Sequence, residues 1–221
     1  MRSVITPLAL AAALTVAAPA VAHADGPVDV LSIRVTKPLP AGVKAKGKTI
    51  EQVWTWGDAD AAHTPSLAVF SSTDTSSSDT SSSGTLDDEP KTFRHRKIYV
   101  QYFRQLRGKW RELRMIQDGE RDCEYDLEVQ FLPGSVQVTD ADGDGQAELS
   151  FLYDRLCASD VSPATRKLLV LEGKAKHALR GTSRVDVGDR FEGGAYKPDG
   201  FKKKRALQVM AEQRWAEFLA K

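Results

Sequence analysis

The 221-residue sequence lacks a surplus of charge of either sign, because 31 Lys and Arg residues face 30 Asp and Glu residues. A protein that binds nucleic acid through its phosphates carries a basic excess, so we expect no nucleic-acid partner. Histidine and cysteine are also scarce, with four and two residues. No His-x-x-x-His or paired-cysteine spacing predicts a zinc site, and no Gly-x-Ser-x-Gly predicts a serine nucleophile. We therefore assign no catalytic residues.

Long apolar runs are absent except near the N-terminus. Arg2 precedes an apolar stretch over residues 8–21, and Ala22, His23 and Ala24 form a small-x-small cleavage site. This arrangement is typical of a secretory signal peptide over residues 1–24. It predicts an exported protein, periplasmic or extracellular, that begins at Asp25. Later segments are too short or too charged to cross a bilayer, so we expect no transmembrane segment.

The two cysteines, Cys123 and Cys157, both follow the predicted cleavage site. An even number of cysteines in an oxidising compartment favours a disulfide. Such a bridge stabilises the fold by about 3–4 kcal/mol in the chain-entropy model. The alternative is a pair of separate buried thiols.

Strand-like segments recur throughout the sequence after the predicted signal peptide. They are short, alternating and rich in β-branched and aromatic residues, and turn residues separate them. They lie at residues 28–35, 49–56, 66–70, 98–103, 110–116, 125–131, 135–139, 149–153, 167–172 and 174–179. The fold class we expect is mainly β, an antiparallel meander or sandwich-like domain. From about residue 202 to 220 the apolar spacing becomes helical, which predicts a C-terminal α-helix.

Residues 71–90 contain long runs of serine and threonine and almost nothing apolar to bury. That composition predicts a disordered insertion. Because both flanks have the same β pattern, we expect one domain over residues 25–221. The alternative is a linker between two domains.

An acidic loop is the most informative stretch. Asp140, Asp142, Asp144 and Glu148 stand at positions 1, 3, 5 and 9, and Gly143 and Gly145 allow a sharp curl. Calcium takes six to eight oxygen ligands in a flexible shell. The expected cofactor is therefore calcium. The predicted ligands are the carboxylates of these four residues and the carbonyl oxygen of Gln146.

This loop does not match an EF-hand. An EF-hand has a bidentate Glu at position 12 and a helix on each side, whereas position 12 here is Phe151 and both flanks are strand-like. The loop is similar instead to the calcium loops of integrin-type propeller repeats. Two alternatives stay open. The Asp-Gly cluster is also ordinary turn chemistry, and a bound ion can be purely structural.

The block from Cys123 to Gly181 resembles a family of exported bacterial proteins named for surface polysaccharide biosynthesis. The resemblance rests on the two cysteines, the acidic loop, and the glycine-centred segments that follow, with Trp54 and Trp110 also in matching places. It implies a cell-envelope context linked to surface polysaccharide, but no reaction and no catalytic residues. The acidic loop and the cysteines are the positions that it carries over.

Three functions are compatible with these features. The first is a non-catalytic accessory or binding role at the cell envelope, with an envelope glycan or envelope protein as partner. The aromatic residues that can contact a sugar in this case, or else pack in the core, are Trp54, Trp56, Tyr99, Tyr102 and Trp110. The second is an envelope-glycan hydrolase that uses paired carboxylates. Its candidates are Asp118, Asp122, Glu124, Asp126 and Asp160. The third is an assembly protein that docks through its C-terminal helix.

Overall fold

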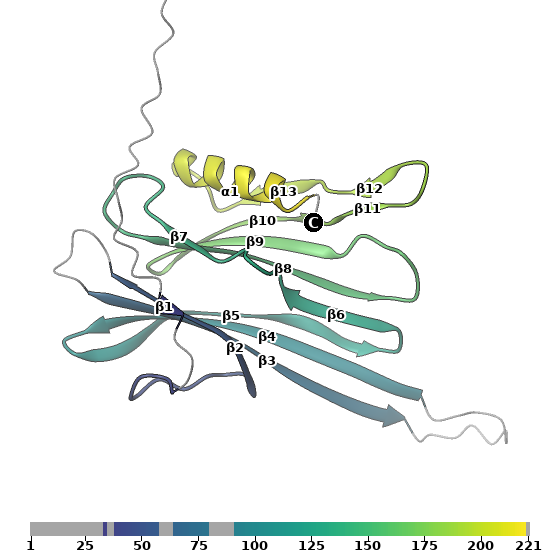
Figure 1. Ribbon diagram of the computed structural model, residues 1–221, viewed down its shortest axis with the longest axis horizontal. Coiled ribbons are helices and arrows are strands. Elements are labelled where there is room, and N and C mark those ends of the chain that lie inside the picture. Colours follow the sequence, from purple (N-terminus) through teal and green to yellow (C-terminus); the bar gives the residue numbers. More distant parts are fainter. Residues whose placement is uncertain (1–32, 35–37, 58–63, 80–90, 220–221) are drawn as a thin grey trace, which may run out of the picture.

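The computed structural model of the protein describes residues 33–34, 38–57, 64–79 and 91–219 (Figure 1). The predicted signal peptide and most of the strand expected at residues 28–35 lie outside these ranges. Within them the chain is mainly β with antiparallel pairing and a C-terminal helix, which confirms the expected fold class.

Two antiparallel sheets form the body of the fold. The first sheet has the order β1-β2-β3-β4-β5, with β1 (Ile33–Arg34), β2 (Thr49–Gly57), β3 (Pro65–Asp79), β4 (Lys91–Leu106) and β5 (Lys109–Cys123). The second has the order β13-β10-β9-β8-β6, and β7 pairs with β8. Its members are β6 (Asp126–Phe131), β7 (Gln137–Thr139), β8 (Glu148–Ala158), β9 (Thr165–Glu172), β10 (Ala175–Thr182) and β13 (Tyr196–Asp199). A small ribbon pairs β11 (Arg184–Asp186) with β12 (Phe191–Gly193).

Each sheet is covered on both faces, so the fold is built in layers (Figure 1). The two sheets enclose the largest core, to which Phe70, Phe131 and Phe151 contribute edge-to-face ring contacts. Helix α1 (Arg205–Glu217) covers the outer face of the second sheet. The segment around Val43 covers the outer face of the first sheet.

Strand β9 (Thr165–Glu172) contains a continuous apolar run over residues 168–171. Leu169 and Leu171 face the core between the sheets, whereas Leu168 and Val170 face helix α1. Successive side chains of a strand point to opposite faces. Where an apolar layer lies on each side of the strand, apolar residues therefore stand at consecutive positions rather than at alternate ones.

The disulfide predicted from the sequence joins Cys123 and Cys157, whose Cα atoms are 5.8 Å apart. Cys123 ends β5 in the first sheet and Cys157 lies in β8 of the second. The bridge therefore ties the two sheets together at the point where the chain passes from one to the other.

The prediction of disorder over residues 71–90 is wrong for its first half. Strand β3 continues through the serine-rich stretch to Asp79 and pairs with β4, in register from Ser66↔Arg104 to Asp79↔Lys91. Residues 80–90 lie outside the described residues. Composition predicted disorder because serine has little to bury, but the backbone ladder does not need apolar side chains. The strand partner also carries complementary charge, and both carboxylate oxygens of Asp74 accept hydrogen bonds from Arg96 at 2.8 Å.

Candidate metal centre

The acidic loop joins β7 to β8, and Thr139 pairs with Glu148 across its base. The strand-loop-strand arrangement expected from the sequence is therefore present, with no helix on either side of the loop. The loop lies next to the start of helix α1, where Ala141 packs against the core beneath the helix. Glu148 is the first residue of β8, so one of the four carboxylates is anchored on the second sheet itself.

Hydrogen bonds to Asp140 give the loop its curl. The backbone N–H groups of Asp144 and Gly145 donate to the two carboxylate oxygens of Asp140, at 3.1 and 3.0 Å. Gly143 and Gly145 have φ angles of 72° and 83°. These left-handed angles are readily adopted by glycine, so the glycines identified from the sequence are used as expected.

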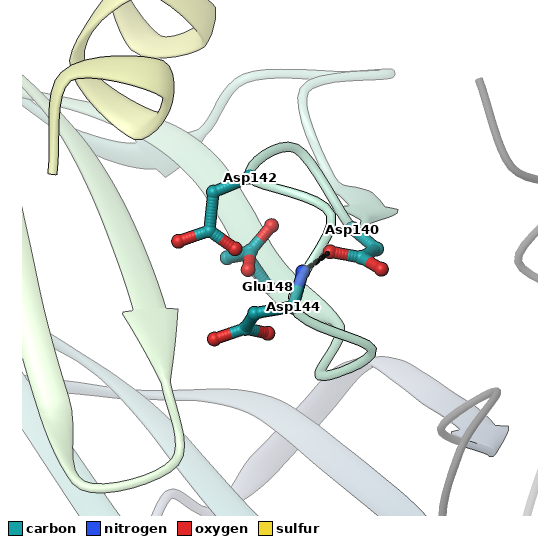
Figure 2. A group of neighbouring side chains, drawn as sticks. All are labelled: Asp140, Asp142, Asp144 and Glu148. Atoms are coloured by element: carbon teal, nitrogen blue, oxygen red, sulfur yellow. Dashed lines mark hydrogen bonds between the residues drawn. The ribbon is translucent and has the colours of Figure 1, made fainter. Parts of the chain in front are cut away.

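All four predicted carboxylates gather in one place (Figure 2). One oxygen of each lies within 4.8 Å of the others. Oxygens that share a calcium ion at 2.3–2.6 Å are at most about 5 Å apart. The group of Asp140, Asp142, Asp144 and Glu148 is therefore compact enough to hold one metal ion.

Glu148 is the buried member of this group, with 0% of its surface exposed. Its Oε2 accepts a 2.8 Å hydrogen bond from the N–H of Ala141. Burial, and next the negative charges of Asp142, Asp140 and Glu172, raise the pKa of Glu148 to about 8, against the lowering effect of that hydrogen bond. A carboxylate in this position needs a cation to stay ionised at neutral pH.

Two oxygens of the group have no hydrogen-bond partner among the described residues. They are Oε1 of Glu148 and Oδ1 of Asp142, and both are buried. A buried polar atom without a partner is costly and calls for an explanation, such as an ion. Both oxygens belong to predicted ligands and lie within the acidic group. The donor set, which consists only of oxygen and is mostly carboxylate, suits a hard cation rather than zinc or copper.

Gln146 was expected to contribute its carbonyl oxygen. The structure places it in the loop, where its N–H donates to Oδ1 of Asp144 at 2.9 Å. The role of its carbonyl oxygen stays a prediction.

Sequence reasoning assigned no role to Lys204, which lies in a run of four basic residues, 202–205, at the start of the predicted helix. Its ammonium lies 2.7 Å from Oδ2 of Asp142 and 2.8 Å from Oε1 of Glu172. The hydrogen bonds to Asp142 and Glu172 raise the pKa of Lys204 above its ordinary value. Charge complementarity is the signal that could have indicated this contact, because an acidic loop attracts a basic segment. The sequence does not indicate which of the four consecutive basic residues reaches the loop.

Among the carboxylates considered for glycoside cleavage, Asp118 is the one that is partly buried. Burial acts to raise the pKa of Asp118, but hydrogen bonds from Lys167, Tyr153 and the Gly119 amide more than offset it, so the pKa lies below its ordinary value. Such a group is a poor general acid. The others, Asp122, Glu124, Asp126 and Asp160, are exposed, and Asp160 accepts a hydrogen bond from Ser162.

The structure brings Ser77, His95 and Asp122 together in an order that resembles a catalytic triad. Oγ of Ser77 is 2.9 Å from Nε2 of His95, and Nδ1 of His95 is 3.6 Å from Oδ1 of Asp122. However, Nδ1 accepts a 3.0 Å hydrogen bond from the backbone N–H of Asp122. The neutral ring then carries its proton on Nε2 and donates it to Ser77. A triad needs the opposite tautomer, with Nε2 free to accept the serine proton.

The aromatic residues considered for a sugar-binding face are mostly core residues. Trp56 and Tyr102 stack at 5.4 Å in the core between the sheets, and Tyr99 is also buried. Trp54 and Trp110 are half-buried and pack against the cores. Core packing, the alternative stated for this set, therefore explains these residues.

Comparison of the chain with protein-family models, with curated proteins and with solved structures found no match. Among the described residues, no helix is long and apolar enough to cross a membrane.

Proposed function

We propose that the protein is an exported calcium-binding β-domain with a non-catalytic accessory role at the cell envelope. The observation that carries the metal site is the buried Glu148 carboxylate, which directs an unpartnered oxygen into a group of three aspartates. Calcium fits better than magnesium, because magnesium requires near-ideal octahedral geometry and keeps several of its waters. The loop supplies many protein oxygens in a flexible arrangement.

The calcium acts as a structural brace in this proposal. The loop joins β7 to β8, and β8 is the strand from which the second sheet extends toward both β6 and β9. A divalent ion neutralises carboxylates that otherwise repel one another at the start of this strand. It therefore stabilises the sheet that carries helix α1.

Export and an envelope role rest on separate observations. The predicted signal peptide and the disulfide both fit an oxidising compartment, and the resemblance to the surface-polysaccharide family suggests the envelope as the site of action. An envelope glycan or envelope protein is the expected partner. For the alternative, an envelope-glycan hydrolase that uses paired carboxylates, the lowered pKa of Asp118 counts against that residue as the general acid.

Thermal unfolding with calcium and with a chelator tests the metal site. Calcium at 100 times its dissociation constant stabilises the folded state by about 2.7 kcal/mol. The wild-type melting temperature should rise with calcium concentration, and the same concentration of magnesium should have a smaller effect. Glu148→Gln keeps the side-chain shape but removes a charged ligand, so it should abolish most of the shift.

Asp189→Asn is the matched control, because Asp189 is an exposed carboxylate on the β11–β12 turn and not part of the acidic group. It should respond to calcium as the wild type does. A wild-type melting temperature that is identical in saturating calcium and in chelator would remove the metal site from this proposal.

A further inference from the structure

Lys204 contacts the acidic loop through Asp142, a residue 62 positions earlier in the sequence. Lys204 is the N-cap residue of α1, but its side chain makes no capping hydrogen bond. Its ammonium instead contacts Asp142, Glu172 and, at 3.6 Å, Oδ2 of Asp144. Two of these three carboxylates belong to the candidate metal site.

The contacts divide the acidic group into two sides. On the outer side, Oδ2 of Asp142 and Oδ2 of Asp144 face the lysine ammonium. On the inner side, Oδ1 of Asp142 and Oε1 of Glu148 are buried without a partner. The ammonium therefore supplies positive charge to two of the candidate metal ligands, and among the described residues its ion pairs do not include Asp140 or Glu148.

A cation held by the inner oxygens lies only a few ångströms from the ammonium, because both are in contact with the same carboxylate, Asp142. The two like charges repel each other at that distance. They also share the charge of Asp142 and Asp144. From this geometry we infer that Lys204 is a built-in competitor of calcium, and that it lowers the affinity of the loop for the ion. The inference rests on the proposed function, since it concerns the same site.

Competition between two cations has a reciprocal consequence. If Lys204 weakens calcium binding by some factor, calcium weakens the attachment of Lys204 to the loop by the same factor. Lys204 starts helix α1, and its carbonyl oxygen accepts the first helical hydrogen bond, from the N–H of Gln208 at 3.1 Å. Calcium binding therefore loosens the first turn of α1 while it stiffens the loop.

Titration calorimetry of the purified protein with calcium chloride tests the inference. The variant Lys204→Met keeps a side chain of similar length and removes the charge. We expect it to bind calcium about tenfold more tightly than the wild type, within the range usual for coupled sites. The matched control is Lys202→Met. Lys202 lies two residues before Lys204, its side chain is exposed, and the substitution removes the same charge. It should change the affinity less than twofold.

The outcomes separate the inference from the proposal beneath it. If the wild type binds calcium and Lys204→Met binds it equally or less tightly, the inference is overturned and the metal site stands. If neither protein binds calcium, both are overturned. If only Lys204→Met binds, the lysine blocks the site in the wild type and the inference is supported.

Hydrogen exchange gives an independent readout of the reciprocal effect. Saturating calcium should speed exchange of the Gln208 amide in the wild type and leave it unchanged in Lys204→Met. Slower exchange of this amide in the calcium-bound wild type would contradict competition, because it would mean that calcium strengthens the attachment of the helix.

Discussion

Glu148 and Asp118 show how neighbours decide the chemistry of a carboxylate. Glu148 is buried among other acids, and its pKa is raised to about 8. Asp118 is also partly buried, but it receives Lys167 at 2.5 Å and Tyr153 at 2.6 Å, and its pKa is lowered. Burial acts in the same direction on both, so the sign of the shift depends on whether cations or anions surround the group.

Asp118 should contribute to stability in a pH-dependent way. Its folded-state pKa is below the ordinary value of 3.8, so its contribution is complete above pH 3.8 and is lost as the pH falls through the folded-state pKa. Asp118→Asn should lower the free energy of unfolding at pH 7 by about 2 kcal/mol, and it should flatten the loss of stability below pH 4. Denaturant unfolding across pH 2–7 measures both effects.

Asp126→Asn is the control for this prediction, because the Asp126 side chain is 94% exposed. Its pH profile should follow that of the wild type. If Asp118→Asn instead has the same acid limb as the wild type, the ties from Asp118 to the second sheet do not contribute to acid stability.

At the scale of single elements, glycines mark where strands approach other backbone segments. An added Cβ at Gly181 in β10 would lie 1.9 Å from the carbonyl oxygen of Ala195. Gly57, at the end of β2, has nothing within 4 Å of such an atom. Both residues are glycine, but only Gly181 lacks room for a side chain. The sequence does not show this difference.

Gly181→Ala should therefore destabilise the protein by about 1–3 kcal/mol, the usual cost of overpacking. A backbone atom cannot rotate away as a side chain can. Gly57→Ala should change the free energy of unfolding by less than about 0.5 kcal/mol. Equal stability of the two variants in urea unfolding would show that β10 and the segment before β13 are not in close contact.

Helix α1 is a layer of the core and not an unattached docking arm. Leu207, Ala211 and Trp215 are buried against the second sheet. The helix spans Arg205–Glu217 rather than the expected residues 202–220. Lys202 and Lys203 precede it, and Lys203 has a φ of 64°, which is outside the helical range. The third functional hypothesis, docking through this helix, would require exposure of the face that the sheet already covers.

Trp215→Ala should cost about 3–5 kcal/mol, because it removes a fully buried ring. It also leaves the carbonyl oxygen of Gly194 without its 3.1 Å hydrogen bond from the indole. Phe191→Ala is the control, since that ring is 62% exposed, and it should have a small effect. Calorimetric unfolding distinguishes the two. If the Trp215→Ala variant is as stable as the wild type, helix α1 does not pack against the second sheet as a layer of the core.

At the scale of the whole molecule, the candidate metal loop and the disulfide lie at opposite ends of strand β8. Glu148 begins β8 and Cys157 lies near its end. At about 3.3 Å per residue these positions are about 30 Å apart. The candidate metal loop connects β8 to β7, and the disulfide connects β8 to β5 in the other sheet. Strand β8 is an inner strand of the second sheet, with the disulfide near one end and the candidate metal loop at the other.

Removing the bridge should destabilise the fold without weakening the metal site. The double variant Cys123→Ser, Cys157→Ser should lose about 3–4 kcal/mol of stability by loop entropy. Its calcium affinity in titration calorimetry should stay within twofold of the wild type, because distant sites act independently. A large loss of affinity would mean that the metal loop and the disulfide are coupled through β8. Mass measurement before and after reduction confirms the bridge in the wild type.

The sequence by itself determined the fold class, the disulfide partners and the compact acidic group. Strand alternation and four carboxylates around two glycines are visible within short windows, and a chain with two cysteines allows only one intramolecular disulfide. The tertiary structure alone decided the strand over Ser71–Asp79, the hydrogen bond from the Asp122 N–H to His95 and the approach of Lys204 to Asp142. Each of these depends on a partner far away in sequence or on backbone hydrogen bonding, which composition and spacing do not encode.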